Sequence, residues 1–198
     1  NGTGSLISLD GYILTCAHVL HGPHVRLVFH DGELKGEYDA SVVFVNQEHD
    51  VALLRCKDIK ATKCFSVCQS NTMAKGDEIL AIGNPAIAAA AEQNIGGASK
   101  GMVSNPDLKL EQEPYLACDI AIASGSSGGP IFSSSTGKIV GVVLATLPPG
   151  VDRVTGFSRS GYVCLAAPTW ALKEWLGLII NEAPAKPKGD AVIPQAAP

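Results

Sequence analysis

The chain has 198 residues, of which 46% are hydrophobic and 17% are charged, and its formal net charge is −4. This composition is typical of a folded globular protein and excludes an extended disordered chain. The acidic balance, without a basic stripe to neutralise phosphates, argues against nucleic acid as a partner. Gly and Pro interrupt the longest apolar stretches, such as residues 139–151, short of the ~18 residues that a membrane helix requires, so we expect no membrane span.

Short apolar runs, rich in β-branched residues and bounded by Gly, Asp, Asn or Pro, recur through the chain. They predict the strands of an all-β sandwich or barrel, because the long alternating helices of an α/β fold are missing. Asp10-Gly11 follows the first run and Asp31-Gly32 the third, and both dipeptides are typical of hairpin turns. In chain order the runs are 5–8, 12–16, 25–29, 41–45, 50–56, 78–82, 139–144 and 162–165.

The pattern changes near the end of the chain. Pro168 opens a predicted helix over residues 168–179, whose apolar face should cap the β core. Residues 183–198 are rich in Ala and Pro and predict a tail or linker. The side chains on the apolar face of the predicted helix are Leu172, Trp175, Leu176 and Ile179.

The segment Gly125-Ser126-Ser127-Gly128-Gly129-Pro130 carries the strongest chemical signal. Its glycines permit backbone angles that place successive N–H groups on one side, next to an exposed hydroxyl. Acyl transfer needs this arrangement, since the amides of Gly125 and Ser127 can stabilise the oxyanion that forms when Ser127 attacks a carbonyl. Taken alone, the segment also fits a glycine-rich turn without chemistry.

A serine hydroxyl is a weak nucleophile and needs a base that a third group orients. Of the five histidines, His18 lies where a predicted buried strand meets a turn, which is a rigid mount for a base. Asp50 directly precedes the apolar run 51–54, where it can be desolvated and fix the histidine tautomer. The alternative aspartates, which lie in more hydrophilic segments, are Asp31, Asp39 and Asp58.

Taken in order, these segments resemble the trypsin-like serine proteases, and most closely their HtrA (Deg) branch. The resemblance runs over about residues 2–179, and the ordered set is more specific than any one motif. The segments that carry it are Gly2-Thr-Gly-Ser-Leu-Ile, Asp10-Gly-Tyr-Ile-Leu-Thr-Cys-Ala-His18, His49-Asp50-Val-Ala-Leu-Leu, Ile82-Gly-Asn-Pro85, Lys100-Gly-Met-Val-Ser104, Tyr115-Leu-Ala-Cys-Asp-Ile-Ala-Ile and Gly125-Ser-Ser-Gly-Gly-Pro.

The resemblance implies two six-stranded antiparallel β-barrels, about residues 1–68 and 74–165, with the active site between them. The chain departs from the HtrA pattern in one respect, since we expect a protease domain that no PDZ domain follows, and the oligomeric state stays open. His18 is then the general base, Asp50 its orienting group and Ser127 the nucleophile, with the amides of Gly125 and Ser127 as the oxyanion hole. The implied reaction is the hydrolysis of protein or peptide substrates through an acyl-enzyme, which needs neither a metal nor an organic cofactor.

The resemblance also implies a substrate pocket lined by the stretch before the nucleophile and by the strand after it. None of these side chains carries a charge, so we expect a preference for small or medium aliphatic side chains before the scissile bond. The predicted lining residues are Ala121, Ile122, Leu144, Ala145 and Thr146.

Six cysteines are too few for a disulfide scaffold, and Cys16 and Cys118 do not fall where trypsin disulfides do. We therefore expect free thiols and, with them, an intracellular reducing compartment. Cys56, Cys64 and Cys68 lack a suitably spaced fourth ligand, so we expect no zinc site.

Two alternatives to an HtrA-like endopeptidase of protein quality control or processing stay open. A viral polyprotein-processing protease has the same barrels and the same Gly-Ser-Ser-Gly-Gly turn. A catalytically silent homologue that binds peptides is the alternative outside enzymes, and the presence of all three triad residue types argues against it.

Overall fold

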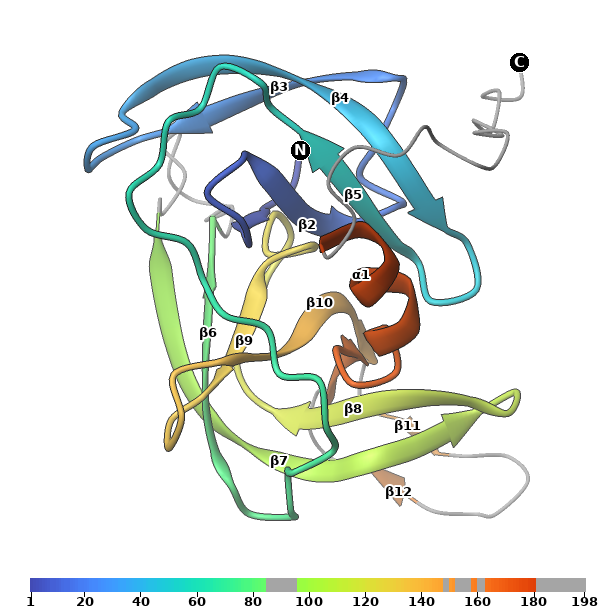
Figure 1. Cartoon of the computed structure of the whole chain (residues 1–198). Coiled ribbons are helices and arrows are strands. Elements are labelled where there is room, and N and C mark those ends of the chain that lie inside the picture. Colours follow the sequence, from blue (N-terminus) through green and yellow to red (C-terminus); the bar gives the residue numbers. More distant parts are fainter. Residues whose placement is uncertain (85–95, 148–149, 152–157, 160–162, 181–198) are drawn as a thin grey trace.

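The computed structural model describes residues 1–84, 96–147, 150–151, 158–159 and 163–180. In this part of the chain almost all regular structure is β, as predicted (Figure 1). The elements are β1 (Ser5–Leu6), β2 (Tyr12–Cys16), β3 (His24–Phe29), β4 (Gly36–Asn46), β5 (Val51–Arg55), β6 (Glu78–Gly83), β7 (Gly97–Leu110), β8 (Glu113–Asp119), β9 (Pro130–Ser133), β10 (Ile139–Leu147), β11 (Gly150–Val151), β12 (Ser158–Arg159), β13 (Val163–Pro168) and α1 (Lys173–Ile180).

The first lobe is an antiparallel sheet in the order β1-β2-β5-β4-β3. The expected hairpin turns are present, and Gly11 has a φ of 86°, which glycine adopts without strain. This sheet has five strands and is open, whereas six strands in a closed barrel were predicted. Strand β1 pairs with β2 over two residues only, and no strand of the described residues joins β1 to β3.

The second lobe is a closed six-stranded barrel in the order β10-β13-β8-β7-β6-β9, as predicted. Its longest strand, β7, was not among the predicted strands, because Gly101, Asn105 and Pro106 interrupt its apolar pattern. Register shifts around Asn105 accommodate the proline, which cannot donate a hydrogen bond to the sheet. A separate small sheet pairs β11 with β12.

One apolar cluster joins the two lobes and the helix. It combines Leu14 and Val51 of the first sheet with Val142 of the barrel and Leu172 beside α1, all at most 1% exposed. The segment between β5 and β6 crosses from one lobe to the other, and it pairs with the barrel at Val67 opposite Ile139 (Figure 1). The lobes therefore share a core at the level where the candidate site lies.

Helix α1 starts at Lys173 rather than at Pro168. Pro168 is the last residue of β13, where it lies opposite Gly141, so the chain is still extended there. Leu172 and Leu176 are buried and Trp175 packs on the same cluster, as the predicted apolar face requires. The side chain of Ile179 and the predicted tail over 183–198 lie outside the described residues. No helix in the described part of the chain is long and apolar enough to cross a membrane.

Candidate active site

The first lobe brings His18 and Asp50 together at the end of two neighbouring strands. His18 follows β2 and Asp50 directly precedes β5, and these strands pair in antiparallel register with Cys16 opposite Val51. One carboxylate oxygen of Asp50 lies 2.6 Å from His18 Nδ1, and the other accepts the backbone N–H of His18 at 2.9 Å. The imidazole is therefore fixed in orientation by a carboxylate that is itself held on the backbone.

Asp50 adopts a left-handed backbone conformation, with a φ of 50°. Aspartate tolerates this region better than most residues, because its short side chain bonds locally. The backbone N–H of Ala17 donates to the Asp50 carbonyl oxygen at 2.9 Å, so successive amides before and at His18 bind the same residue. The side chains of His18 and Asp50 are 46% and 36% exposed, so the base faces solvent.

The turn at Gly125–Pro130 joins the second barrel to this pair. Gly125 and Gly128 have φ values of 95° and 83°, which require glycine. Within the turn the amides of Ser126, Gly128 and Gly129 donate to Ala123, Val143 and Ser126, respectively. The amides of Gly125 and Ser127 donate to no acceptor in the described residues. These are the two N–H groups that the resemblance assigns to the oxyanion hole.

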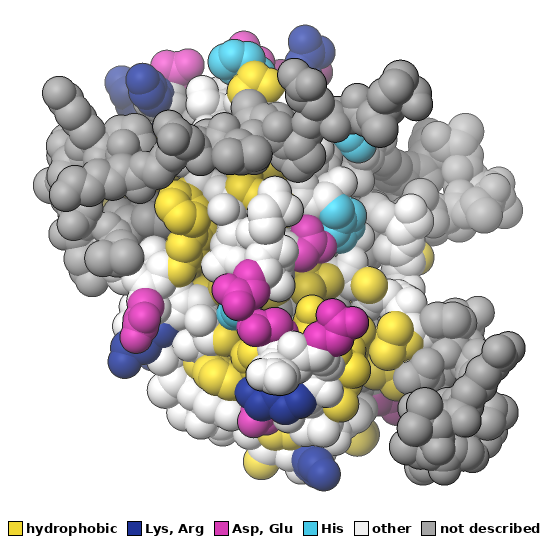
Figure 2. All heavy atoms as spheres, turned by 90° about the vertical axis from the view of Figure 1, so that its right-hand side faces the viewer, with side chains coloured by type: hydrophobic (Ala, Val, Ile, Leu, Met, Phe, Trp, Pro, Cys, Tyr) yellow, Lys and Arg dark blue, Asp and Glu magenta, His cyan; other side chains and the backbone are white. Residues whose placement is uncertain are grey.

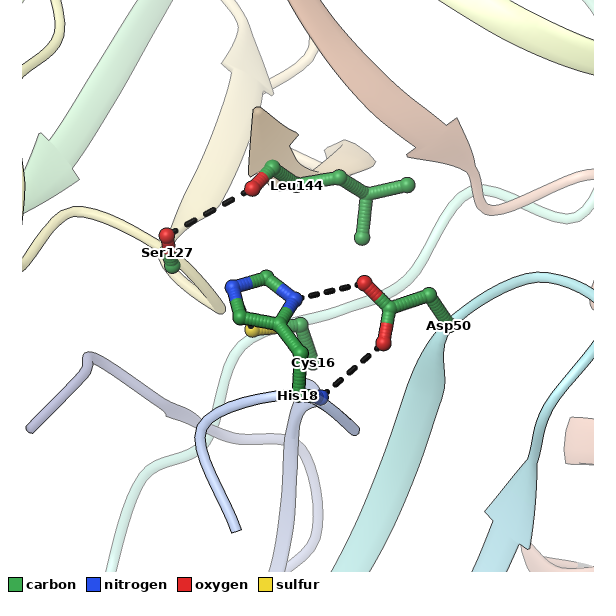
Figure 3. A network of polar contacts seen from close by, with 5 residues as sticks. All are labelled: Cys16, His18, Asp50, Ser127 and Leu144. Carbon is green, nitrogen blue, oxygen red and sulfur yellow. Dashed lines mark hydrogen bonds and ion pairs between the residues drawn. The ribbon is translucent and has the colours of Figure 1, made fainter. Parts of the chain in front are cut away.

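The structure places Ser127 on the far side of the imidazole from Asp50 (Figure 3). His18 Nε2 faces Ser127, whereas Nδ1 faces the carboxylate. The Ser127 hydroxyl donates to the Leu144 carbonyl oxygen at 3.4 Å, and it is not hydrogen-bonded to His18. In serine hydrolases without substrate, the contact between nucleophile and base is often long and tightens only with substrate bound.

Cys16 is a neighbour of His18 that the sequence pattern did not reveal. Its buried Sγ lies 3.6 Å from His18 Nε2 (Figure 3). Burial raises the pKa of the Cys16 thiol to about 12, and the negative charge of Asp50 adds to this effect. The thiol therefore stays protonated, and beside a nitrogen that accepts a proton it acts as a weak donor rather than as a second nucleophile.

A cavity of about 220 Å³ lies behind the turn, between the barrel strands and the stretch before Ser127. It contains two of the predicted pocket residues, Ala121 and Ile122. Strand β10 contributes Val143 to it, whereas Leu144, Ala145 and Thr146 are not in its lining. Among the described residues no charged side chain lines this cavity, and the described lining consists of Ala81, Ile82, Gly83, Gly97, Ser99, Ala121, Ile122, Ala123, Ser126 and Val143.

A second hollow is acidic. It lies between the turn that precedes Asp50 and the tip of the β7–β8 hairpin, with Glu48, Glu111 and Glu113 in its lining. Figure 2 shows acidic side chains gathered near the centre of this face of the molecule. His49 Nδ1 lies 3.6 Å from a carboxylate oxygen of Glu113, so a side chain of each lobe meets the other beside the site. The negative potential here favours the approach of basic segments.

All six cysteines are free in the structure, and Cys64 alone among them is exposed. Cys68 is buried, and its thiol donates to the Ser70 carbonyl oxygen at 3.4 Å. Within the described residues, no three His, Cys, Asp or Glu side chains are grouped so as to hold a metal ion.

Comparison with known proteins identifies the family of the chain. A family model described as the trypsin-like peptidase domain matches residues 2–142. The chain is 35% identical over 197 residues to a protein of Pseudomonas savastanoi pv. phaseolicola named as a probable periplasmic serine endoprotease, DegP-like, covering 91% of the chain and 38% of that protein. It is 31% identical to the protein of the same name from Rhizobium meliloti, over 77% of the chain and 29% of that protein.

The chain is 29% identical to the serine protease HTRA1 of Xenopus laevis, over 77% of the chain and 33% of that protein. The chain thus spans between 29% and 38% of the length of these relatives. With the family model covering most of its length, the chain belongs to the trypsin-like peptidase family, among relatives of the DegP and HtrA kind.

Proposed function

We propose that the chain is a serine endopeptidase of the HtrA kind that hydrolyses peptide bonds through an acyl-enzyme. The observation that carries this proposal is the imidazole of His18, which Asp50 holds at Nδ1 while Nε2 faces Ser127 (Figure 3). The short Nδ1 contact favours the tautomer whose Nε2 is free of a proton. That nitrogen can accept the proton of Ser127 as its hydroxyl attacks a substrate carbonyl.

In this mechanism the carbonyl oxygen of the substrate gains negative charge as the Oγ–C bond forms. In this proposal the amides of Gly125 and Ser127 donate to it, and neither amide has an acceptor of its own among the described residues. His18 then returns the proton to the leaving amine, and water hydrolyses the acyl-enzyme by the same route. Asp50 compensates the charge of the imidazolium in both steps.

Labelling with a fluorophosphonate probe tests the nucleophile, the base and the hole together. Ser127 Oγ attacks phosphorus, fluoride leaves, and His18 takes up the hydroxyl proton. We expect rapid labelling of the wild type and none of Ser127→Ala, with His18→Ala slowed at least about a thousandfold. Ser104→Ala, which removes an exposed hydroxyl from β7, is the matched control and should label like the wild type. Equal labelling of Ser127→Ala and the wild type would reject the serine mechanism.

We propose further that the uncharged cavity beside the turn selects small or medium aliphatic side chains before the scissile bond. The part of its lining that the structure describes offers no carboxylate to a Lys or Arg side chain, and burying an unpaired cation is costly. Ile122, which is partly buried there, is the residue to change. Profiling of cleavage in a denatured proteome should show aliphatic residues for the wild type and for Ile122→Val, and a gain of Lys and Arg for Ile122→Asp. A wild type that prefers Lys or Arg contradicts this assignment.

A further inference from the structure

Thr3, near the start of the chain, binds the turn that carries Ser127 at two points. Its hydroxyl donates to the Gly125 carbonyl oxygen at 2.8 Å, and its backbone N–H donates to the Ser127 carbonyl oxygen at 2.8 Å. The same hydroxyl accepts the backbone N–H of Asn84 at 3.1 Å, and the Thr3 carbonyl oxygen accepts the hydroxyl of Thr15 at 2.7 Å. One residue of the first lobe therefore ties the end of β6 to the turn.

These bonds fix alternate peptide planes of the turn. In a trans peptide the C=O and the following N–H point in opposite directions. In the plane between Gly125 and Ser126, the Gly125 carbonyl accepts the Thr3 hydroxyl and the Ser126 amide donates to the Ala123 carbonyl. In the plane after Ser127, the Ser127 carbonyl accepts the Thr3 N–H and the Gly128 amide donates to the Val143 carbonyl. The plane that carries the Ser127 amide is held by the amide of Gly129, which donates to the Ser126 carbonyl oxygen at 2.9 Å.

The amide of Gly125 has no such direct support. It belongs to the peptide plane before Gly125, and neither this amide nor the Ser124 carbonyl makes a backbone hydrogen bond within the described residues. Its direction is set by rotation about Gly125, which has a φ of 95° and lacks the Cβ that restricts other residues. The hydroxyl of Thr3 anchors the plane on the other side of that rotation.

We propose that Thr3 is a positioning residue, whose hydroxyl holds the Gly125 amide in the direction that an oxyanion requires. The inference rests on the proposed function, because it concerns the hole of the same reaction. The turn packs closely against Thr3, since a Cβ at Gly129 would lie 3.4 Å from the Thr3 methyl group and a Cβ at Gly128 would clash with the Thr3 carbonyl oxygen. Valine keeps nearly the same shape and removes only the hydroxyl, and serine keeps the hydroxyl.

The test compares Thr3→Val, Thr3→Ser and a control, Thr169→Val. Thr169 is buried, and its hydroxyl bonds the carbonyl oxygens of Cys68 and Ile139 at 2.7 and 3.1 Å; among the described residues none of these three bonds to Thr3, Gly125 or Ser127. The control therefore loses as many side-chain hydrogen bonds without touching the site. The measurements are kcat and KM on a peptide substrate, the inhibition constant of a peptide boronic acid, the melting temperature, and the ¹H–¹⁵N resonances of Gly125 and Ser127.

For Thr3→Val we expect kcat to fall about 10- to 100-fold with KM unchanged, less than the ~10²–10³-fold that complete loss of a hole donor costs. The boronic acid, whose tetrahedral adduct occupies the hole, should bind more weakly by the same factor. Thr3→Ser should recover kcat to within about threefold of the wild type. The Gly125 resonance should move more than that of Ser127, and Thr169→Val should change the melting temperature but neither kcat nor these resonances.

Three results overturn the inference. They are an unchanged kcat in folded Thr3→Val, an equal loss in Thr3→Ser and Thr3→Val, and a loss of kcat in Thr169→Val that matches that of Thr3→Val. If the wild type neither turns over peptides nor reacts at Ser127, the proposed function fails instead. The resonance measurement still decides the positioning role in that case, because an undisturbed Gly125 amide in Thr3→Val rejects it without reference to activity.

Discussion

Asp50→Asn separates the orientation of the base from the stability of the fold. The backbone N–H of His18 donates to one carboxylate oxygen of Asp50, so an asparagine must place its carbonyl oxygen there. Its NH₂ group then faces His18 Nδ1, which has to accept rather than donate. The imidazole proton moves to Nε2, and Ser127 loses its acceptor. In the opposite rotamer the NH₂ group of the asparagine faces the backbone N–H of His18, so that two hydrogen-bond donors meet and neither has an acceptor.

The expected loss in kcat/KM is about 10⁴-fold, or ~5 kcal/mol of transition-state stabilisation, as for loss of the orienting carboxylate in serine proteases. The expected loss of stability is far smaller. Both side chains are more than one third exposed, and such solvent-screened pairs contribute only ~0.2–1 kcal/mol to folding. Asparagine also tolerates the positive φ at this position. We therefore expect the melting temperature to fall by no more than about 2–4 °C.

The assay is kcat/KM on a fluorogenic peptide, with the melting temperature measured on the same preparations. Asp39→Asn is the matched control, because Asp39 is exposed on β4 opposite Arg26 and touches neither His18 nor Ser127. It should leave kcat/KM and the melting temperature unchanged. A folded Asp50→Asn that keeps more than about a tenth of the wild-type kcat/KM refutes the tautomer argument, and a large effect of Asp39→Asn reassigns the orienting carboxylate.

Three further outcomes follow from burial and backbone geometry. Alkylation of the native protein without reductant should modify Cys64 alone, and alkylation after denaturation should modify all six cysteines, as measured by mass spectrometry. A pair of cysteines that stays unmodified in the denatured protein would contradict the prediction of free thiols. Gly128→Ala should prevent folding or activity, because its Cβ would clash with Thr15 and the φ of this residue is 83°. Gly137→Ala, which has open space around it, should lower the free energy of unfolding by only about 1 kcal/mol. Equal stability of the two variants in chemical denaturation argues against a closely packed turn. Burial raises the pKa values of three thiols above the ordinary 9.0, to about 12 for two of them. In the unfolded chain these thiols lose their protons at a lower pH than in the folded protein. In reductant the free energy of unfolding should therefore be fully retained below pH 9 and fall above it, by up to about 4 kcal/mol per pH unit. A free energy of unfolding that is constant from pH 8 to about pH 11 would show that these thiols are not buried. The thiols concerned are Cys16, Cys118 and Cys164.

Local signals predicted the parts of the site that depend on strand ends. The apolar run after Asp50 and the strand before His18 are visible in the sequence, and the antiparallel pairing of these strands brings the two side chains together. Strand β7 was missed because an Asn-Pro step breaks its alternation, and register shifts that no local pattern encodes repair the pairing. The start of the helix was misplaced because a proline suits the end of a strand as well as the first turn of a helix.

The role of Thr3 could not be predicted in this way. Its hydroxyl donates to Gly125, which lies 122 positions further along the chain. A hydrogen bond between residues so far apart produces no periodic pattern in the sequence. The proximity of Cys16 to His18 Nε2 has a similar origin, because it depends on how the ring is turned by Asp50. Spacing along the chain identified the candidate triad, whereas the groups that support it emerge only from tertiary contacts.

The apolar cluster between the lobes makes the two halves a single cooperative unit. Leu14 and Val51 complete their burial only against the barrel and the residues beside α1, so neither half can satisfy its interior when the other is absent. The proposed base, His18, and its orienting group, Asp50, come from one half, and the proposed nucleophile, Ser127, comes from the other. Separation of the lobes exposes this shared interior to water and, in the same event, moves His18 and Asp50 away from Ser127. Under the proposed function, peptide turnover should therefore be lost in the same unfolding transition as the strands of both sheets.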